Sequence, residues 1–349
     1  MIKLSYNKKI GYGQPCFIIA EAGVNHNGSL SLAKKLVDIA VKAKADAVKF
    51  QTFIADEIIL KKAPKARYHI ETTGSNKKLS WYNLLKSQEI SIKMHKELIK
   101  YCKKKKIIFI STPYDKKSAD LLENLGVEIF KIASTDTNNY QLINYISKKG
   151  KPVILSTAMS SYKEVVQSFK ILKKNLKDKF AIMQCTGSYP APLFEANLNV
   201  INTYKKQFQC LVGYSDHVLD DSAVLVACSM DIHCYEKHIT VDKKLPGPDH
   251  RASCNKKEFI EIVKKIKKIE RIKGSNIKEI VRCEKKNISK LKKFLVAEKD
   301  INLNEKLTDK NITFKRTGGK GISAAKYFEI IGKFAKKKYK KNSVIDKIK

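Results

Sequence analysis

Several features that define common protein classes are missing from this chain of 349 residues. No apolar run approaches the roughly 18 residues that cross a membrane, and no segment near the start has the form of a secretory signal. The eight cysteines include no CxxC pair, so their spacing predicts neither a zinc site nor a disulfide framework. No GxGxxG motif follows the first apolar run, which argues against a dinucleotide-binding fold. We therefore expect a cytoplasmic protein with buried free thiols and no membrane partner.

Arginine is scarce, although the net charge is +36, with 70 Lys and Arg residues against 34 Asp and Glu residues. A balance this basic is common in nucleic-acid-binding proteins. Here Lys recurs on the polar face of nearly every helix-like segment, while Arg, the side chain that most often reads base edges, is rare. The charge therefore indicates a general compositional bias, and we expect no nucleic-acid partner. A basic surface still attracts anionic substrates.

What the chain does have is a repeated pattern of short apolar runs that end in polar or charged residues. The runs cover residues 17–23, 47–52, 107–113, 129–134, 152–157, 180–185, 210–217 and 234–240. Amphipathic stretches lie between them, among them 30–44, 117–126, 164–175 and 259–274. Alternation of strand and helix gives a parallel sheet, whose strands are buried on both faces and so read as apolar runs. Eight such units favour an α/β fold of the (β/α)8 TIM-barrel type.

The pattern changes after about residue 274. We expect a barrel domain over residues 1–272, a polar linker over 273–289 and a small second domain over 290–349. The second domain is too small for a strong core of its own, so we expect it to dock on another surface. A long insertion over residues 53–91, which contains the only Trp, is expected to shape access to the barrel.

Two histidines end neighbouring runs of the predicted barrel. The carboxyl ends of barrel strands converge on the rim that carries the active site, and adjacent strands lie about 4.8 Å apart. His217 and His238 can therefore share one divalent metal ion that keeps open positions for water and substrate. Two rim histidines that are only hydrogen-bonded are the alternative that the spacing leaves open. Asp216 and Glu236 flank the histidines and are candidates to orient them.

A ring of hydrogen-bond donors shares the same rim. Lys49 and Lys131 are joined there by the hydroxyl groups of Thr112, Ser134, Ser156 and Ser215. Ammonium and hydroxyl donors suit a ligand that carries both a phosphate and a carboxylate, although a Schiff base on one lysine is a rival. Glu21 and Asp136 are strand-end carboxylates that can position a sugar hydroxyl or activate water. The stiff loop 245–253 brings Asp249 to the rim.

At these residues the chain resembles the sialic acid synthase family. The motifs, in order, are EAGVNHNGSL, KFQTF, STPYD, FKIAS, ILSTAMS, CTGSYPAP, VGYSDH, EKHIT, GPDHRAS and FKRTGGKGIS. The resemblance implies a TIM barrel followed by an antifreeze-like (SAF, β-clip type) domain. It also implies an enzyme that condenses phosphoenolpyruvate with an N-acetylated hexosamine, either N-acetylmannosamine or a 2,4-diacetamido-6-deoxyhexose. The product would be a nonulosonic acid, a nine-carbon 2-keto acid, and phosphate would be released.

The resemblance also implies roles for individual residues. His217 and His238 look like the ligands of a divalent metal ion, commonly Mn²⁺, with Mg²⁺ or Co²⁺ as alternatives. The residues that look like the phosphoenolpyruvate site are Lys49, Thr112, Lys131, Ser134, Ser156 and Ser215. Those that look like contacts to the amino-sugar are Glu21, Gln51, Tyr189 and Asp249. Arg316 resembles a residue that one subunit inserts into its partner's barrel, which implies a domain-swapped homodimer.

Two positions depart from the family pattern. Asp136 stands where the family often has Glu, which shortens the side chain by one methylene, and Gly187 stands where a side-chain amide or hydroxyl is common. Two other interpretations stay open: a related phosphoenolpyruvate-dependent synthase or an aldolase acting on another aldose, and a basic protein that only binds nucleic acid or carbohydrate. Whether Glu21 or Asp136 manages the proton of the attacking water is also left open.

Overall fold

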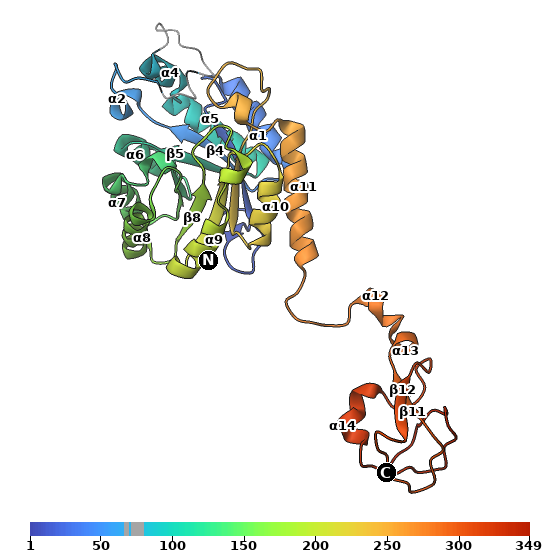
Figure 1. Ribbon diagram of the computed structural model, residues 1–349. Helices are drawn as coiled ribbons and strands as arrows, with labels where there is room; N and C mark the ends of the chain where they lie inside the picture. The colour runs from blue at the N-terminus through green and yellow to red at the C-terminus, as the bar shows by residue number, and fades with distance from the viewer. Residues whose placement is uncertain (66–69, 71–79) are drawn as a thin grey trace. The chain divides into compact units, whose positions relative to one another are not determined.

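The computed structural model describes residues 1–65, 70 and 80–349, and Figure 1 shows its elements. Eight of the described strands close into a parallel barrel in the order β10-β3-β4-β5-β6-β7-β8-β9. Each apolar run of the sequence forms one of them, so the predicted TIM barrel is confirmed. The strands are β3 (Phe17–Gly23), β4 (Ala47–Thr52), β5 (Ile108–Pro113), β6 (Phe130–Ile132), β7 (Val153–Ser156), β8 (Phe180–Cys185), β9 (Leu211–Asp216) and β10 (Cys234–His238).

Amphipathic helices surround the barrel (Figure 1). They are α1 (Leu30–Ala43), α5 (Ile92–Lys105), α6 (Lys116–Asn124), α7 (Tyr140–Lys148), α8 (Tyr162–Leu176), α9 (Asn199–Phe208), α10 (Ser222–Ser229) and α11 (Lys256–Lys273). Their starts follow from local sequence: Ser29 caps α1 by accepting from the Leu32 amide, and Ser161 with Glu164 forms a capping box on α8. The expected insertion carries α2 (Ala55–Ile58) and α4 (Trp81–Gln88), while residues 66–69 and 71–79 of it lie outside the described residues.

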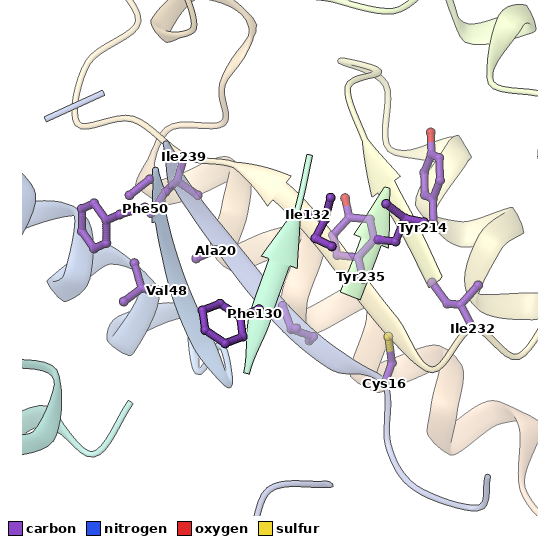
Figure 2. Close-up of a cluster of buried hydrophobic side chains, with 14 of the residues drawn as sticks. Cys16, Ala20, Val48, Phe50, Phe130, Ile132, Tyr214, Ile232, Tyr235 and Ile239 are labelled. Carbon is purple, nitrogen blue, oxygen red and sulfur yellow. The ribbon is translucent and has the colours of Figure 1, made fainter. Parts of the chain in front are cut away.

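Alternate residues of each strand face the inside and the outside of the barrel, because side chains of a strand alternate between its two faces. The outward residues, among them Ala20, Val48, Phe50, Phe130 and Tyr235, pack in the apolar layer between strands and helices (Figure 2). The inward residues form a separate apolar cluster toward the amino ends of the strands. That cluster contains Phe17, Ile19, Ala47, Ile108, Ile110, Ile129, Ile154, Ala181, Met183, Leu211 and Cys234.

The amino-terminal hairpin belongs to the same interior cluster. Its strands, β1 (Ile2–Lys3) and β2 (Lys9–Ile10), pair antiparallel, and Ile2 and Ile10 are both buried against the inward residues. With the amino end of the barrel filled by apolar side chains, polar inward residues are confined to the carboxyl end, where a binding site can form.

The chain folds as two compact units, Met1–Gly274 and Ser275–Lys349. The second contains α12 (Arg282–Lys285), α13 (Ile288–Leu291), the antiparallel pair β11 (Phe294–Ala297) and β12 (Ile312–Lys315), and α14 (Tyr327–Ile330). Its own core is small and includes Leu295, Ile301, Leu307, Ile312, Ile330, Tyr339 and Ile345. Arg316 is exposed directly after β12 and donates from Nε to the Leu291 carbonyl at 3.3 Å.

Two further expectations concern cysteine and the membrane. All eight cysteines are free, and six of them are buried, which confirms the expected buried thiols. Across the described ranges, no helix combines the length and the apolar character that a membrane crossing requires.

Candidate active site

A cavity of about 740 Å³ lies at the carboxyl end of the barrel and gathers the residues singled out from the sequence. Asp216 and Arg316, the latter in the second unit, are not among its lining residues. The predicted residues that line the cavity are Glu21, Lys49, Gln51, Thr112, Lys131, Ser134, Asp136, Ser156, Tyr189, Ser215, His217, His238 and Asp249.

Strand register explains why residues far apart in sequence meet here. Glu21 on β3 pairs with His238 on β10 and with Lys49 on β4. On the other side of β10, Ser215 on β9 pairs with Glu236. Each of these residues occupies an inward-facing position of its strand. Their side chains therefore form a polar layer next to the apolar interior, on its carboxyl-end side.

Two lysines and two carboxylates form the centre of this polar layer. Lys49 Nζ lies 2.8 Å from Glu21 Oε1 and donates to Thr112 Oγ1 at 3.0 Å. Lys131 Nζ donates to Ser156 Oγ at 2.6 Å. Glu236 lies between the lysines, 3.9 Å from Lys49 and 3.7 Å from Lys131. The cluster is nearly inaccessible to solvent, so its charges act on one another with little screening.

Burial and these contacts set the protonation of the cluster. Burial raises the pKa of Glu21 to about 7 against the attraction of Lys49. Burial by itself would also raise the pKa of Glu236, but Lys131 and Lys49 hold it below its usual value. For Lys49, burial is outweighed by the neighbouring carboxylates and the pKa is raised, whereas burial dominates at Lys131 and lowers its pKa. At neutral pH, Glu21 therefore lies near the midpoint of its titration.

The two predicted histidines lie side by side, with ring centroids 5.4 Å apart. The Nδ1 atom of His217 is 2.7 Å from the Thr186 carbonyl, which leaves its Nε2 for a ligand. His238 Nδ1 is buried without a hydrogen-bond partner among the described residues, 3.8 Å from Asp249 Oδ2. Tyr189 contacts both rings: its centroid is 4.2 Å from that of His217, with the planes tilted, and 5.6 Å from that of His238, edge to face.

The environments of the two imidazoles differ. Burial and the neighbouring His217 hold the pKa of His238 well below its usual range, so this ring is neutral. Burial would lower the pKa of His217 as well, but attraction to the thiolate form of Cys185, whose sulfur lies 3.6 Å from Nδ1, raises it to about 9. Burial also raises the pKa of Asp249, to about 6. A neutral imidazole beside a buried carboxylate is a setting that suits a divalent cation.

Comparisons with known proteins agree with this geometry. The model of the NeuB family matches residues 36–278, and the SAF domain matches residues 292–347. The chain belongs to the NeuB family. It is 43% identical over 330 residues to N,N'-diacetyllegionaminic acid synthase of Campylobacter jejuni, an alignment that covers 94% of this chain and 98% of that protein.

Two more relatives place the chain in the NeuB family over most of its length. It is 33% identical to human N-acetylneuraminate-9-phosphate synthase, with 95% of this chain and 92% of that protein aligned. The crystal structure of the sialic acid synthetase of Leptospira borgpetersenii in complex with citrate has a TM-score of 0.71 at 37% identity, covering 82% of this chain and 94% of that chain. As a NeuB-family member, the chain is an enzyme of the synthase type, with a TIM barrel and a SAF domain.

Within the described residues, the flanking carboxylates of Asp216 and Glu236 make no hydrogen bond to the histidines that they were expected to orient; a backbone carbonyl holds His217 instead. Glu236 accepts from Ser215 Oγ at 3.1 Å and faces the cavity, and Asp216 faces away from it. Strand parity was the signal that separates them, since Glu236 is two residues from His238 and Asp216 is adjacent to His217.

The two departures from the family pattern both lie on the cavity wall. Asp136 is held by Asn139, which donates to Oδ1 at 2.9 Å, and burial raises its pKa. At Gly187 a β-carbon would lie only 2.7 Å from Cγ of Met159. The Met159 side chain therefore occupies the space that a polar residue at position 187 would need, and it makes this part of the wall apolar.

Proposed function

We propose that this chain condenses phosphoenolpyruvate with an N-acetylated hexosamine, and that the sugar is a 2,4-diacetamido-6-deoxyhexose. The observation that carries the proposal is one cavity that holds two buried lysines beside a pair of imidazoles with centroids 5.4 Å apart. The choice of sugar is supported by the higher identity to the legionaminic acid synthase, 43%, than to the human sialic acid enzyme, 33%. The apolar contact of Met159 with Gly187 suits a sugar that lacks a hydroxyl group.

The lysines supply the binding site for phosphoenolpyruvate. Lys49 and Lys131 carry ammonium groups with hydroxyl partners on Thr112 and Ser156, a donor set that matches a phosphate and a carboxylate. Glu236 holds both ammonium groups in the free enzyme, so the anionic substrate shares them with this carboxylate. The Ser134 hydroxyl, by contrast, accepts from the Ala158 amide at 2.9 Å and shapes the wall.

The residues at the histidine pair fit a divalent metal ion, on which NeuB-family synthases depend. The neutral ring of His238 is available as a ligand, with Asp249 close by. Nε2 of His217 would join it once the metal displaces the proton that the raised pKa of this ring retains. Over the described part of the chain, no group of three or more His, Cys, Asp or Glu side chains is arranged to hold a metal ion, so water and substrate oxygens would have to complete a site on the two histidines. We propose Mn²⁺, with Mg²⁺ or Co²⁺ as alternatives. When bound, such an ion polarises the sugar aldehyde as a Lewis acid.

The chain's own residues then manage charge and protons. C3 of phosphoenolpyruvate forms the new bond to the aldehyde carbon, water adds at C2, and the C–O bond to phosphate breaks. Lys49 and Lys131 offset the charge of the departing phosphate. Glu21 accepts the proton of the attacking water, because its pKa of about 7 lies near neutrality and its Oε2 has no hydrogen-bond partner among the described residues.

The direct test is phosphate release from phosphoenolpyruvate, measured with Mn²⁺ across a panel of amino-sugars. We expect release with the 2,4-diacetamido-6-deoxyhexose and weaker release with N-acetylmannosamine. Release with N-acetylmannosamine alone would overturn the sugar assignment, and no release with any N-acetylated hexosamine would overturn the function. Free thiols fit the cytoplasm as the place of this reaction.

Arg316 enters the proposal through a second subunit. The second unit offers this exposed guanidinium next to a glycine-rich run, and we propose a domain-swapped homodimer in which it completes the partner's site. Mixing an inactive His217→Ala chain with an inactive Arg316→Ala chain should restore activity, because one of the two sites in a heterodimer then carries neither defect. Exchanged heterodimers without activity, or an active monomer, would contradict the swap.

A further inference from the structure

A buried ion pair lies behind β9 and β10, on the face of these strands that points away from the cavity. Asp216 and Lys237 are cross-strand partners in the register, and Lys237 Nζ is 2.9 Å from Asp216 Oδ2. Each residue is 1% exposed. The proposed reaction uses neither side chain, although each directly adjoins one of the two histidines in sequence.

The pair is the centre of a network whose hydrogen bonds converge on one backbone unit. Tyr214 and Tyr235 donate their hydroxyl groups to Asp216 at 3.1 and 2.7 Å, and both rings lie in the apolar layer outside the strands (Figure 2). Asp216 Oδ1 accepts from the Val218 amide at 2.9 Å, and Lys237 Nζ donates to the Val218 carbonyl. Both polar groups of the Val218 backbone are thus held by the ion pair.

This arrangement fixes His217 from both sides. His217 lies between Asp216, in the last position of β9, and Val218, which the pair holds in place. The His217 carbonyl accepts from the Ala191 amide at 2.9 Å, so the backbone here has little freedom. Lys237 immediately precedes His238, and therefore the same contact couples the strand ends that carry the two imidazoles.

A gain in folding stability does not by itself explain why a buried ion pair is present here. Removing two charges from water costs about as much as their attraction returns, and well-packed apolar residues often serve as well or better. Buried ionic groups are best attested as devices that fix one geometry among several. Groups that do not touch the metal but hold its ligands in place also matter: their removal lowers metal affinity by roughly 10- to 100-fold.

We propose that the Asp216–Lys237 pair is a positioning device that sets the spacing of the His217 and His238 imidazoles for a shared divalent cation. The inference rests on the proposed function, since it assumes that the two histidines bind one ion. It adds two positioning residues that touch neither substrate nor metal and act only through the Val218 backbone and the coupled strand ends.

The test compares Asp216→Asn, Lys237→Met and the double variant, each in the full chain. The matched control is Thr52→Val, because Thr52 is also buried and outward-facing, with hydrogen bonds to His95 at 2.8 Å and Ser111 at 2.6 Å behind β4 and β5. Mn²⁺ affinity is measured by calorimetry, and thermal unfolding reports stability separately.

Each single variant should lose stability, because it leaves one buried charge unpaired, and the double variant should regain part of that loss. All three should bind Mn²⁺ at least about 10-fold more weakly than the wild type, since each loses at least one contact of the device. The Thr52→Val control should lose stability and keep its Mn²⁺ affinity. A folded double variant that binds Mn²⁺ within about threefold of the wild type would overturn the proposal, because a purely structural pair predicts this result.

A wild type that binds no divalent cation would instead overturn the metal site of the proposed function. The positioning role is then judged without metal, from the imidazole signals of ¹⁵N-histidine-labelled protein. One conformer of the His217 ring in the wild type and the Thr52 control, with exchange broadening in the three variants, supports the device. Unchanged His217 signals in the variants refute it.

Discussion

Replacing Lys131 by Met removes one of the two buried ammonium groups proposed to bind phosphoenolpyruvate. Lys131 is 2% exposed and donates to Ser156 Oγ at 2.6 Å, and its nearest carboxylate is Glu236 at 3.7 Å. Met keeps the length and the apolar stem of the side chain, so the barrel should keep its packing while the site loses one positive charge.

The size of the effect follows from the contact that is lost. A hydrogen bond to a charged group contributes about 1.5–3 kcal/mol, which corresponds to roughly 10- to 150-fold in a dissociation constant. The variant also leaves Glu236 with only Lys49, 3.9 Å away, so its carboxylate repels the anionic substrate more strongly. We therefore expect the dissociation constant of phosphoenolpyruvate to rise toward the upper end of that range.

The assay is calorimetric titration of phosphoenolpyruvate without metal, and Lys237→Met is the matched control. Both lysines are almost fully buried and lie in strands of the same barrel, but Lys237 faces away from the cavity. Lys131→Met should weaken phosphoenolpyruvate binding, whereas Lys237→Met should leave it near the wild-type value. A change of less than about threefold in a folded Lys131→Met protein would refute the assignment of this lysine to the anion site.

Three further predictions concern the metal, the pH dependence and the sugar. His238→Ala should abolish metal-dependent turnover, and full phosphate release by this variant after chelator treatment would remove the metal hypothesis. The pKa of Glu21 is raised from 4.5 to about 7, so between these pH values the folded state keeps a proton that the unfolded state releases. The free energy of unfolding of the wild type should therefore fall as the pH rises through this range, by up to about 3 kcal/mol. Thermal unfolding of Glu21→Gln across this range should show a weaker pH dependence, with Asp249 left to act in the same direction; identical slopes would contradict the assignment. Gly187→Ser should displace the Met159 side chain and raise the KM for the amino-sugar more than the KM for phosphoenolpyruvate. Equal shifts of both KM values in steady-state kinetics would show that the cavity wall at Met159 is not part of the sugar site.

Much of the barrel and of its polar rim was predictable because both follow from local pattern. Each strand is a short apolar run, and its last inward residues carry the polar groups, so Glu21, Lys49, Thr112 and Ser156 were assigned from sequence position alone. The helix starts at Ser29 and Ser161 are equally local, since each cap joins residues only three positions apart.

Distances across the barrel were decided only by the tertiary structure. The place of Glu236 between two lysines depends on the register of β10 against β9 and on closure of the whole sheet. The contact of Lys237 with Asp216, and that of Met159 with Gly187, join residues from different strands and loops. A sequence pattern states which face of a strand a residue takes, because that alternation is local. It does not state which residue stands opposite, because that is set by how eight strands pair and close around one core.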